Sequence, residues 1–139
     1  AGDEINNIKR GASYGWPVSS YGEDYSRGQS NEAPNYKKSH KKYDYVEPIF
    51  SFVPAIGISE IIKLPNNFSE MWQDNFLVGS LNGMHLFRIK FDDDYEKIIY
   101  YEKIFIGDRI RDIIYDNKSK DIFLSLELTG SLGILSRAN

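Results

Sequence analysis

Two arginines, Arg109 and Arg111, stand two positions apart at the start of a predicted strand. Because successive side chains of a strand point to opposite faces, both guanidinium groups lie on the same side of the sheet. A guanidinium is planar and offers paired N–H donors, which suit a carboxylate ligand. Taken by themselves, the residues favour a solvated pair whose charge is balanced by Asp108 and Asp112.

The two histidines do not stand in a recognisable catalytic arrangement. His40 belongs to the basic run of residues 37–42, and His85 follows Gly83 and Met84 on a predicted strand. A single histidine on a strand is more often structural than catalytic. The sequence shows no Ser-His-Asp arrangement, phosphate-binding loop or zinc-ligand spacing.

Composition excludes several classes of protein. The chain has 139 residues, a formal charge of −3 and no cysteine, so a disulfide scaffold is excluded. No segment approaches the ~18 consecutive apolar residues of a membrane-spanning helix, so we expect no membrane insertion. The mildly acidic chain gives no attraction to nucleic acid, and the basic run is interpreted as an exposed loop. The absence of a starting methionine suggests processing or a longer parent.

The elements that position these residues are predicted to be strands. From residue 44 onward, short runs rich in Ile, Val, Phe and Tyr alternate with turn residues, and no segment shows a helical stripe. Asn82-Gly83 is the strongest hairpin signal, since both residues tolerate positive φ. The predicted strands are residues 45–52, 59–64, 75–80, 85–91, 97–104, 109–115, 122–127 and 132–136.

The strands fall into two groups, from 59 to 104 and from 109 to the last residue, the second being one strand short. This spacing predicts antiparallel blades of a β-propeller, about two to three of them, and a β-sandwich is the alternative. We expect three segments: a loop-rich region with aromatics and glycines over 1–44, a first blade region over 45–104, and a last blade over 105–139.

Several short motifs, in the right order, resemble one family. They are G-D-E-I-N at residues 2–6, Y-G-W-P at 14–17, P-A-I-G-I-S at 54–59, N-F-L-V-G-S-L at 75–81 and R-I-R-D at 109–112. Together they are similar to the glucose/sorbosone dehydrogenase family of soluble quinoprotein sugar dehydrogenases, which includes the aldose sugar dehydrogenases.

The resemblance implies a six-bladed β-propeller that holds pyrroloquinoline quinone (PQQ) with calcium and basic residues. In that chemistry a histidine takes the proton of the C1 hydroxyl of a sugar while hydride passes to the quinone. The resemblance covers the C-terminal portion of such a propeller, with the family's catalytic histidine upstream, so no catalytic residue is expected here. An exported, periplasmic location is also implied.

Cofactor-binding positions follow residue by residue from the resemblance. Arg109, Ile110 and Arg111 match the segment that contacts the carboxylates of the quinone. Ser80, Leu81 and Asn82 match a turn at which the family presents a lysine. Asn82 can donate a hydrogen bond, but it supplies no positive charge, and Asn82-Gly83 also fits a plain hairpin turn.

Metal and substrate positions are implied in the N-terminal segment. Glu4 would bind calcium through its carboxylate and Tyr14 through its main-chain carbonyl, with an acid such as Glu23 or Asp24 following. A surface acid beside a packed aromatic is the alternative. Phe52 matches a position that lines the substrate entrance.

Two further expectations remain open. One is that the same fold serves as a non-catalytic binding module, because Asn82 and Phe52 depart from the family pattern. The other is self-association, or pairing with the missing blades, because a partial propeller leaves exposed strand edges.

Overall fold

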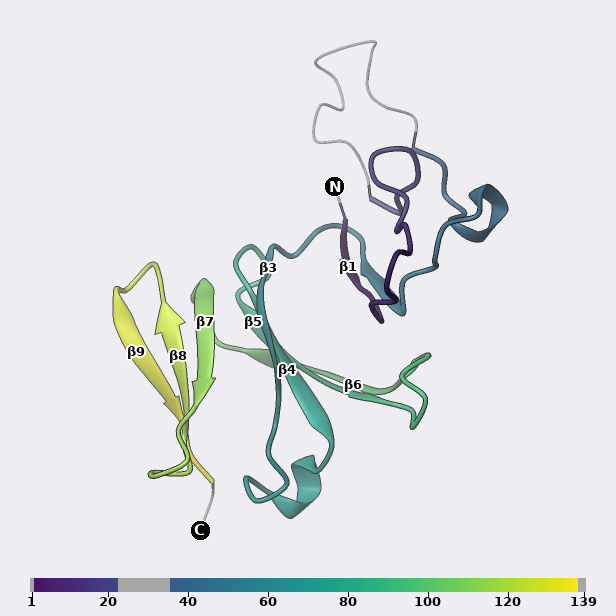
Figure 1. Cartoon of the computed structure of the whole chain (residues 1–139). Coiled ribbons are helices and arrows are strands. Elements are labelled where there is room, and N and C mark those ends of the chain that lie inside the picture. Colours follow the sequence, from purple (N-terminus) through teal and green to yellow (C-terminus); the bar gives the residue numbers. More distant parts are fainter. Residues whose placement is uncertain (1, 23–35, 138–139) are drawn as a thin grey trace. The chain divides into compact units, whose positions relative to one another are not determined.

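The computed structural model describes residues 2–22 and 36–137, and it divides the chain into two compact units (Figure 1). The first unit comprises Ala1–Ile56 with Tyr95–Lys97, and the second comprises Gly57–Asp94 with Ile98–Asn139. In the described residues, regular structure consists of β-strands and two short 3-10 turns, so the predicted all-β class is confirmed. None of these residues forms a helix with the length and apolar character needed to cross a membrane.

The second unit contains two antiparallel sheets in which consecutive strands are neighbours. The four-stranded sheet has the order β3-β4-β5-β6, and the three-stranded sheet has the order β7-β8-β9. The strands are β3 Ile58–Lys63, β4 Asn75–Ser80, β5 His85–Phe91, β6 Ile98–Phe105, β7 Ile110–Tyr115, β8 Ile122–Leu126 and β9 Ser131–Leu135. Both predicted strand groups are therefore confirmed in the described residues, where the second sheet has one strand fewer than the first.

A hydrophobic core joins these two sheets face to face. Alternation along the strands explains it, because Leu77 on β4 and Leu86 on β5 point to the same face, which β7 and β8 cover with Ile110 and Leu124. The buried cluster consists of Leu64, Phe68, Leu77, Leu86, Ile110, Ile113, Ile122 and Leu124. Strand β7 contacts both β3 and β4, as expected for neighbouring blades of a propeller.

Close approach of the two sheets requires the glycine at position 79. A Cβ atom there would lie 2.8 Å from Ser59 Oγ and 3.1 Å from both Ile110 Cγ2 and Ile113 Cδ1. The end of β4 is therefore packed directly on the start of β7.

The hairpin between β4 and β5 forms where Asn82-Gly83 predicts it, although its conformation differs. The residue with positive φ is Met84, with φ 52°, and neither Asn82 nor Gly83 is in the left-handed region.

The first unit contains a two-stranded sheet, in which β1 (Asp3–Ile5) pairs antiparallel with β2 (Phe50–Phe52). The predicted strand 45–52 is thus confirmed only over its last three residues, because Pro48 has no N–H to donate to a ladder. Strand β1 is too short to show a periodic pattern. Tyr14 closes the loop that follows β1: its hydroxyl donates to the Asn7 carbonyl at 2.8 Å.

Candidate functional site

The two arginines of the predicted cofactor segment converge on one carboxylate. Arg109 directly precedes β7 and Arg111 is the second residue of that strand. Glu127 Oε2 lies 2.5 Å from Arg111 Nε and 3.4 Å from Arg109 Nε. The counter-charge is therefore Glu127, which follows β8, rather than the expected Asp108 and Asp112. Arg109 Nε is buried and has no hydrogen-bond partner.

Asp108 holds the start of the arginine strand in place. Its side chain is buried, and Oδ1 accepts the N–H groups of Arg109 at 2.6 Å and Leu128 at 2.8 Å. Oδ2 accepts from the N–H of Thr129 at 3.1 Å and from its hydroxyl at 2.7 Å. Burial opposes ionisation of Asp108, but these hydrogen bonds outweigh it and lower the pKa of the carboxyl.

The second predicted cofactor segment is the turn after β4. The hydroxyl of Ser80 is fully buried, donates to the His85 carbonyl at 2.8 Å and accepts the His85 N–H at 3.1 Å. Leu81 N–H donates to the Gly57 carbonyl at 2.8 Å, and Asn82 is exposed. Of the three predicted residues, Asn82 presents the side chain that is open to a ligand.

The structure brings the two predicted cofactor segments together at neighbouring strand ends. Gly79 precedes Ser80, and it packs on Ile110, the residue between the two arginines. The side chain of Ile110 is fully buried in the core, so only its backbone could face a ligand. One end of the second unit therefore carries two guanidinium groups and one exposed amide.

A buried histidine lies at the centre of the first unit, and the sequence reading missed it. His40 is 0% exposed, its Nε2 lies 3.7 Å from Glu4 Oε1, and its Nδ1 lies 3.7 Å from Glu47 Oε2. Neither ring nitrogen has a hydrogen-bond partner among the described residues. The sequence signal was weak, because His40 stands in a lysine-rich run and one of its two acidic partners, Glu4, is far away along the chain.

Tyr21 completes this cluster. Its ring stacks on His40 with centroids 5.1 Å apart, and its hydroxyl donates to Glu47 Oε2 at 2.7 Å. The hydrogen bond to Glu47, burial and the negative charges of Glu47 and Glu4 together raise the pKa of Tyr21 to about 12.

The described residues of the first unit do not complete a calcium site. Glu4 directs its carboxylate at His40, while Glu23 and Asp24 lie outside the described residues. In the described part of the chain, no group of three or more His, Asp or Glu side chains could hold a metal ion. Calcium takes six to eight oxygen ligands, which is more than Glu4 and the Tyr14 carbonyl supply by themselves. The predicted substrate-lining Phe52 is buried, 5% exposed, with its ring edge against Phe50.

Consecutive antiparallel sheets packed face to face define this fold as part of a β-propeller, and solved structures share it. A structure of glucose dehydrogenase matches with a TM-score of 0.81 and 22% identity, over 99% of this chain and 39% of that one. The apo form of the soluble aldose sugar dehydrogenase from Escherichia coli matches with a TM-score of 0.78 and 22% identity, over 98% and 38%.

The family model described as Glucose / Sorbosone dehydrogenase matches residues 1–132, and the chain belongs to this family. The protein slr1608 of Synechocystis, which is uncharacterised, is 33% identical over 112 residues, 81% of this chain and 26% of its own length. The E. coli aldose sugar dehydrogenase YliI is 27% identical over 114 residues, 81% of this chain and 29% of its own. The chain thus spans less than a third of these two relatives.

Proposed function

We propose that this chain supplies quinone-binding side chains to a propeller that oxidises the C1 hydroxyl of a sugar with PQQ as cofactor. The observation that carries this proposal is the convergence of Arg109 and Arg111 on a single carboxylate oxygen. When bound, PQQ supplies the acceptor for hydride, which no protein side chain provides. The proposal includes an exported, periplasmic location, which rests on the family alone.

The arginine end fits a ligand that bears carboxylates. Glu127 marks where a carboxylate is held, and the buried Arg109 Nε, which lacks a hydrogen-bond partner, has an N–H left to donate. Arg111 is about half exposed, so an incoming ligand can reach it. Asn82, at the adjacent strand end, can donate one further hydrogen bond.

We do not assign removal of the proton of the sugar C1 hydroxyl to either histidine of this chain. His40 is fully buried between Glu4 and Glu47, and His85 lies in the β4–β5 hairpin with its ring against Phe87 and Phe105. Calcium binding by Glu4 and by the Tyr14 carbonyl stays a prediction, and no step is derived through it.

The test is a calorimetric titration of PQQ into the protein and its variants. We expect Arg111→Met to weaken PQQ binding at least tenfold. The affinity of Arg111→Lys should lie between those of the parent protein and Arg111→Met, because an ammonium keeps the charge but lacks the planar fork of the guanidinium. Arg137→Met, an exposed arginine near the C-terminus, serves as the control and leaves the affinity unchanged. Absence of PQQ binding, or equal losses in the Arg111 and Arg137 variants, would overturn the proposal.

A second candidate function is a propeller that binds ligands without quinone chemistry. It is favoured by Asn82, which supplies no charge to stabilise a reduced, anionic quinone. If this candidate is correct, the complete propeller, with the upstream histidine that the family resemblance implies, binds PQQ without reducing it when sugar is added, even after Asn82→Lys. Sugar-dependent bleaching of the quinone absorbance in that variant supports the dehydrogenase instead.

A further inference from the structure

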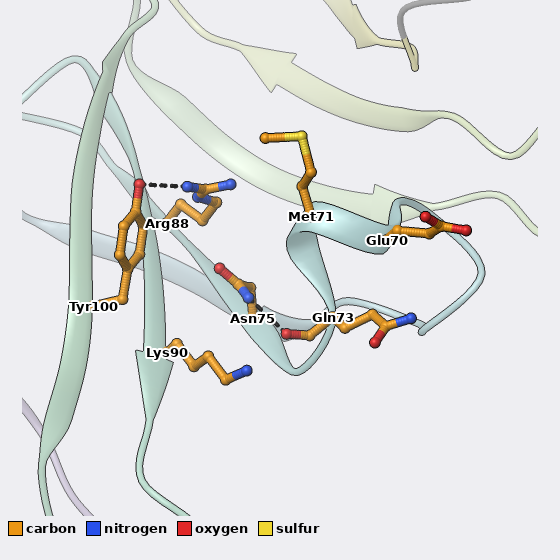
Figure 2. Close-up of a pocket in the computed structure, with 7 residues that line it drawn as sticks. All are labelled: Glu70, Met71, Gln73, Asn75, Arg88, Lys90 and Tyr100. Atoms are coloured by element: carbon orange, nitrogen blue, oxygen red, sulfur yellow. Dashed lines mark hydrogen bonds between the residues drawn. The ribbon is translucent and has the colours of Figure 1, made fainter.

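A pocket of about 250 Å³ lies in the second unit, away from the arginine pair (Figure 2). It is formed by the 3-10 turn η2 (Glu70–Trp72), the segment that leads into β4, and strands β5 and β6. Its lining residues are Glu70, Met71, Gln73, Asn75, Arg88, Lys90 and Tyr100. The proposed quinone site uses none of them.

Arg88 is the fixed element of this pocket. It is 8% exposed, and its guanidinium carbon lies 4.6 Å from the ring centroids of both Trp72 and Tyr100. Its Nε lies 2.8 Å from Glu102 Oε2, and a terminal nitrogen donates to the Tyr100 hydroxyl, as Figure 2 shows. Two rings and one carboxylate thus hold the group and neutralise its charge.

Lys90 supplies a positive charge that nothing nearby neutralises. It stands two residues after Arg88 on β5, so both side chains lie on the same face of the sheet. Lys90 makes no ion pair with any described residue, and Figure 2 shows the Glu70 carboxylate directed away from Arg88. Because Glu102 already balances Arg88 and the Glu70 carboxylate pairs with neither cation, the strand side of the pocket carries one unpaired positive charge, on Lys90.

The remaining polar groups add one donor and one acceptor. The Tyr100 hydroxyl accepts from Arg88, which leaves its own proton free to be donated into the pocket. Asn75 is 4% exposed, and its Nδ2 donates to the Gln73 carbonyl at 2.7 Å, which leaves the side-chain oxygen as an acceptor. A ligand that satisfies all three groups has one carboxylate and at least one hydroxyl.

We propose that this pocket binds a small hydroxycarboxylate. Lys90 and the Tyr100 hydroxyl bind the carboxylate, and the Asn75 oxygen accepts a hydrogen bond from a hydroxyl of the ligand. The one unpaired cation, Lys90, matches a monoanion, whereas a phosphate dianion would leave a negative charge unpaired in the pocket. A neutral polyol would leave the Lys90 ammonium without a partner.

The test compares three ligands of matched length by calorimetry on the intact chain. D-gluconate has the carboxylate and the hydroxyls, sorbitol has the hydroxyls alone, and hexanoate has the carboxylate alone. We expect gluconate to bind at least tenfold more tightly than either analogue. No gluconate binding, or equal binding of sorbitol or hexanoate, would overturn the proposal.

Substitutions locate the binding in this pocket. Lys90→Met is expected to weaken gluconate binding at least tenfold, and Tyr100→Phe severalfold. Lys103→Met is the matched control, since Lys103 pairs with Phe87 on β5 and lies on the opposite face of the same sheet. Equal effects of Lys90→Met and Lys103→Met would place the ligand elsewhere. Arg111→Met should leave gluconate binding unchanged, so this result and the quinone test are independent.

Discussion

The carboxylate of Glu127 lies 2.5 Å from Arg111 Nε, and it comes from the end of a different strand, β8. Both side chains are partly exposed, Arg111 by 51% and Glu127 by 31%. An incoming carboxylate that binds Arg111 has to displace Glu127 or share the guanidinium with it. Glu127 therefore competes with any acidic ligand at this strand end.

Removing that competitor should strengthen quinone binding. Glu127→Gln is expected to raise the affinity for PQQ roughly fivefold, equivalent to the loss of about 1 kcal/mol from a partly exposed ion pair. Isothermal titration calorimetry measures it, with Glu70→Gln as a control that removes an exposed carboxylate elsewhere. If Glu127→Gln instead weakens binding as much as Arg111→Met does, Glu127 orients the arginines.

Asp108 should make the second unit sensitive to acid. Its pKa is lowered in the folded protein, because hydrogen bonds from Thr129, Leu128 and Arg109 outweigh the effect of burial. The ionised Asp108 carboxylate therefore contributes fully to stability when the pH is above the pKa of an ordinary aspartate, about 3.9. This contribution is lost as the pH falls through the lower pKa that Asp108 has in the folded protein.

We expect Asp108→Asn to be less stable than the parent protein at pH 7 and to show a flatter loss of stability between pH 4 and 2. Urea unfolding at a series of pH values measures this. Asp94→Asn, in an exposed turn, is the control. An unchanged acid profile in Asp108→Asn would show that other carboxyls cause the acid sensitivity.

Gly79→Ala should destabilise the contact between the two sheets. The added methyl group would meet Ser59 Oγ at 2.8 Å and Ile110 Cγ2 at 3.1 Å, and overpacking of this kind costs ~1–3 kcal/mol of unfolding free energy. Thermal unfolding followed by circular dichroism measures the loss. The double variant Ser59→Ala/Gly79→Ala removes the closest contact and should recover part of it. Full stability of Gly79→Ala would contradict the packing described above.

The outer face of the three-stranded sheet should support self-association. Ile114 and Ile134 are 62% and 58% exposed, and both stand in register with Phe123 on β8, so they form an apolar row across the sheet. We expect a second copy of the chain to cover this row. Sedimentation velocity should show dimers at high concentration, which Ile114→Lys/Ile134→Lys removes and Ile99→Lys on β6 retains. A monomer at every concentration would refute this expectation.

Most strands of the second unit were predictable, because their Ile, Val, Phe and Tyr residues recur between turn signals. Strand β1 was not, since three residues carry no periodicity and its partner, Phe50–Phe52, is more than forty residues away. The spacing of Arg109 and Arg111 predicted a shared side of the sheet. Their partner Glu127 was missed, because the register between β7 and β8 decides which acid faces them. The pocket residues Lys90 and Tyr100 could not be predicted as neighbours either, because only the register between β5 and β6 brings them together.

The contact between Gly79 and Ile110 also bears on which ligands the arginine end accepts. One segment of the proposed quinone site ends β4 and the other begins β7, and the buried side chains of Ile110 and Ile113 pack against the bare backbone of Gly79. The separation of the two strand ends that carry Asn82 and the arginines is thus fixed by buried core side chains on a glycine backbone. A ligand of the proposed quinone site that touches both strand ends would have to match that separation, so we expect this end of the fold to select molecules by length.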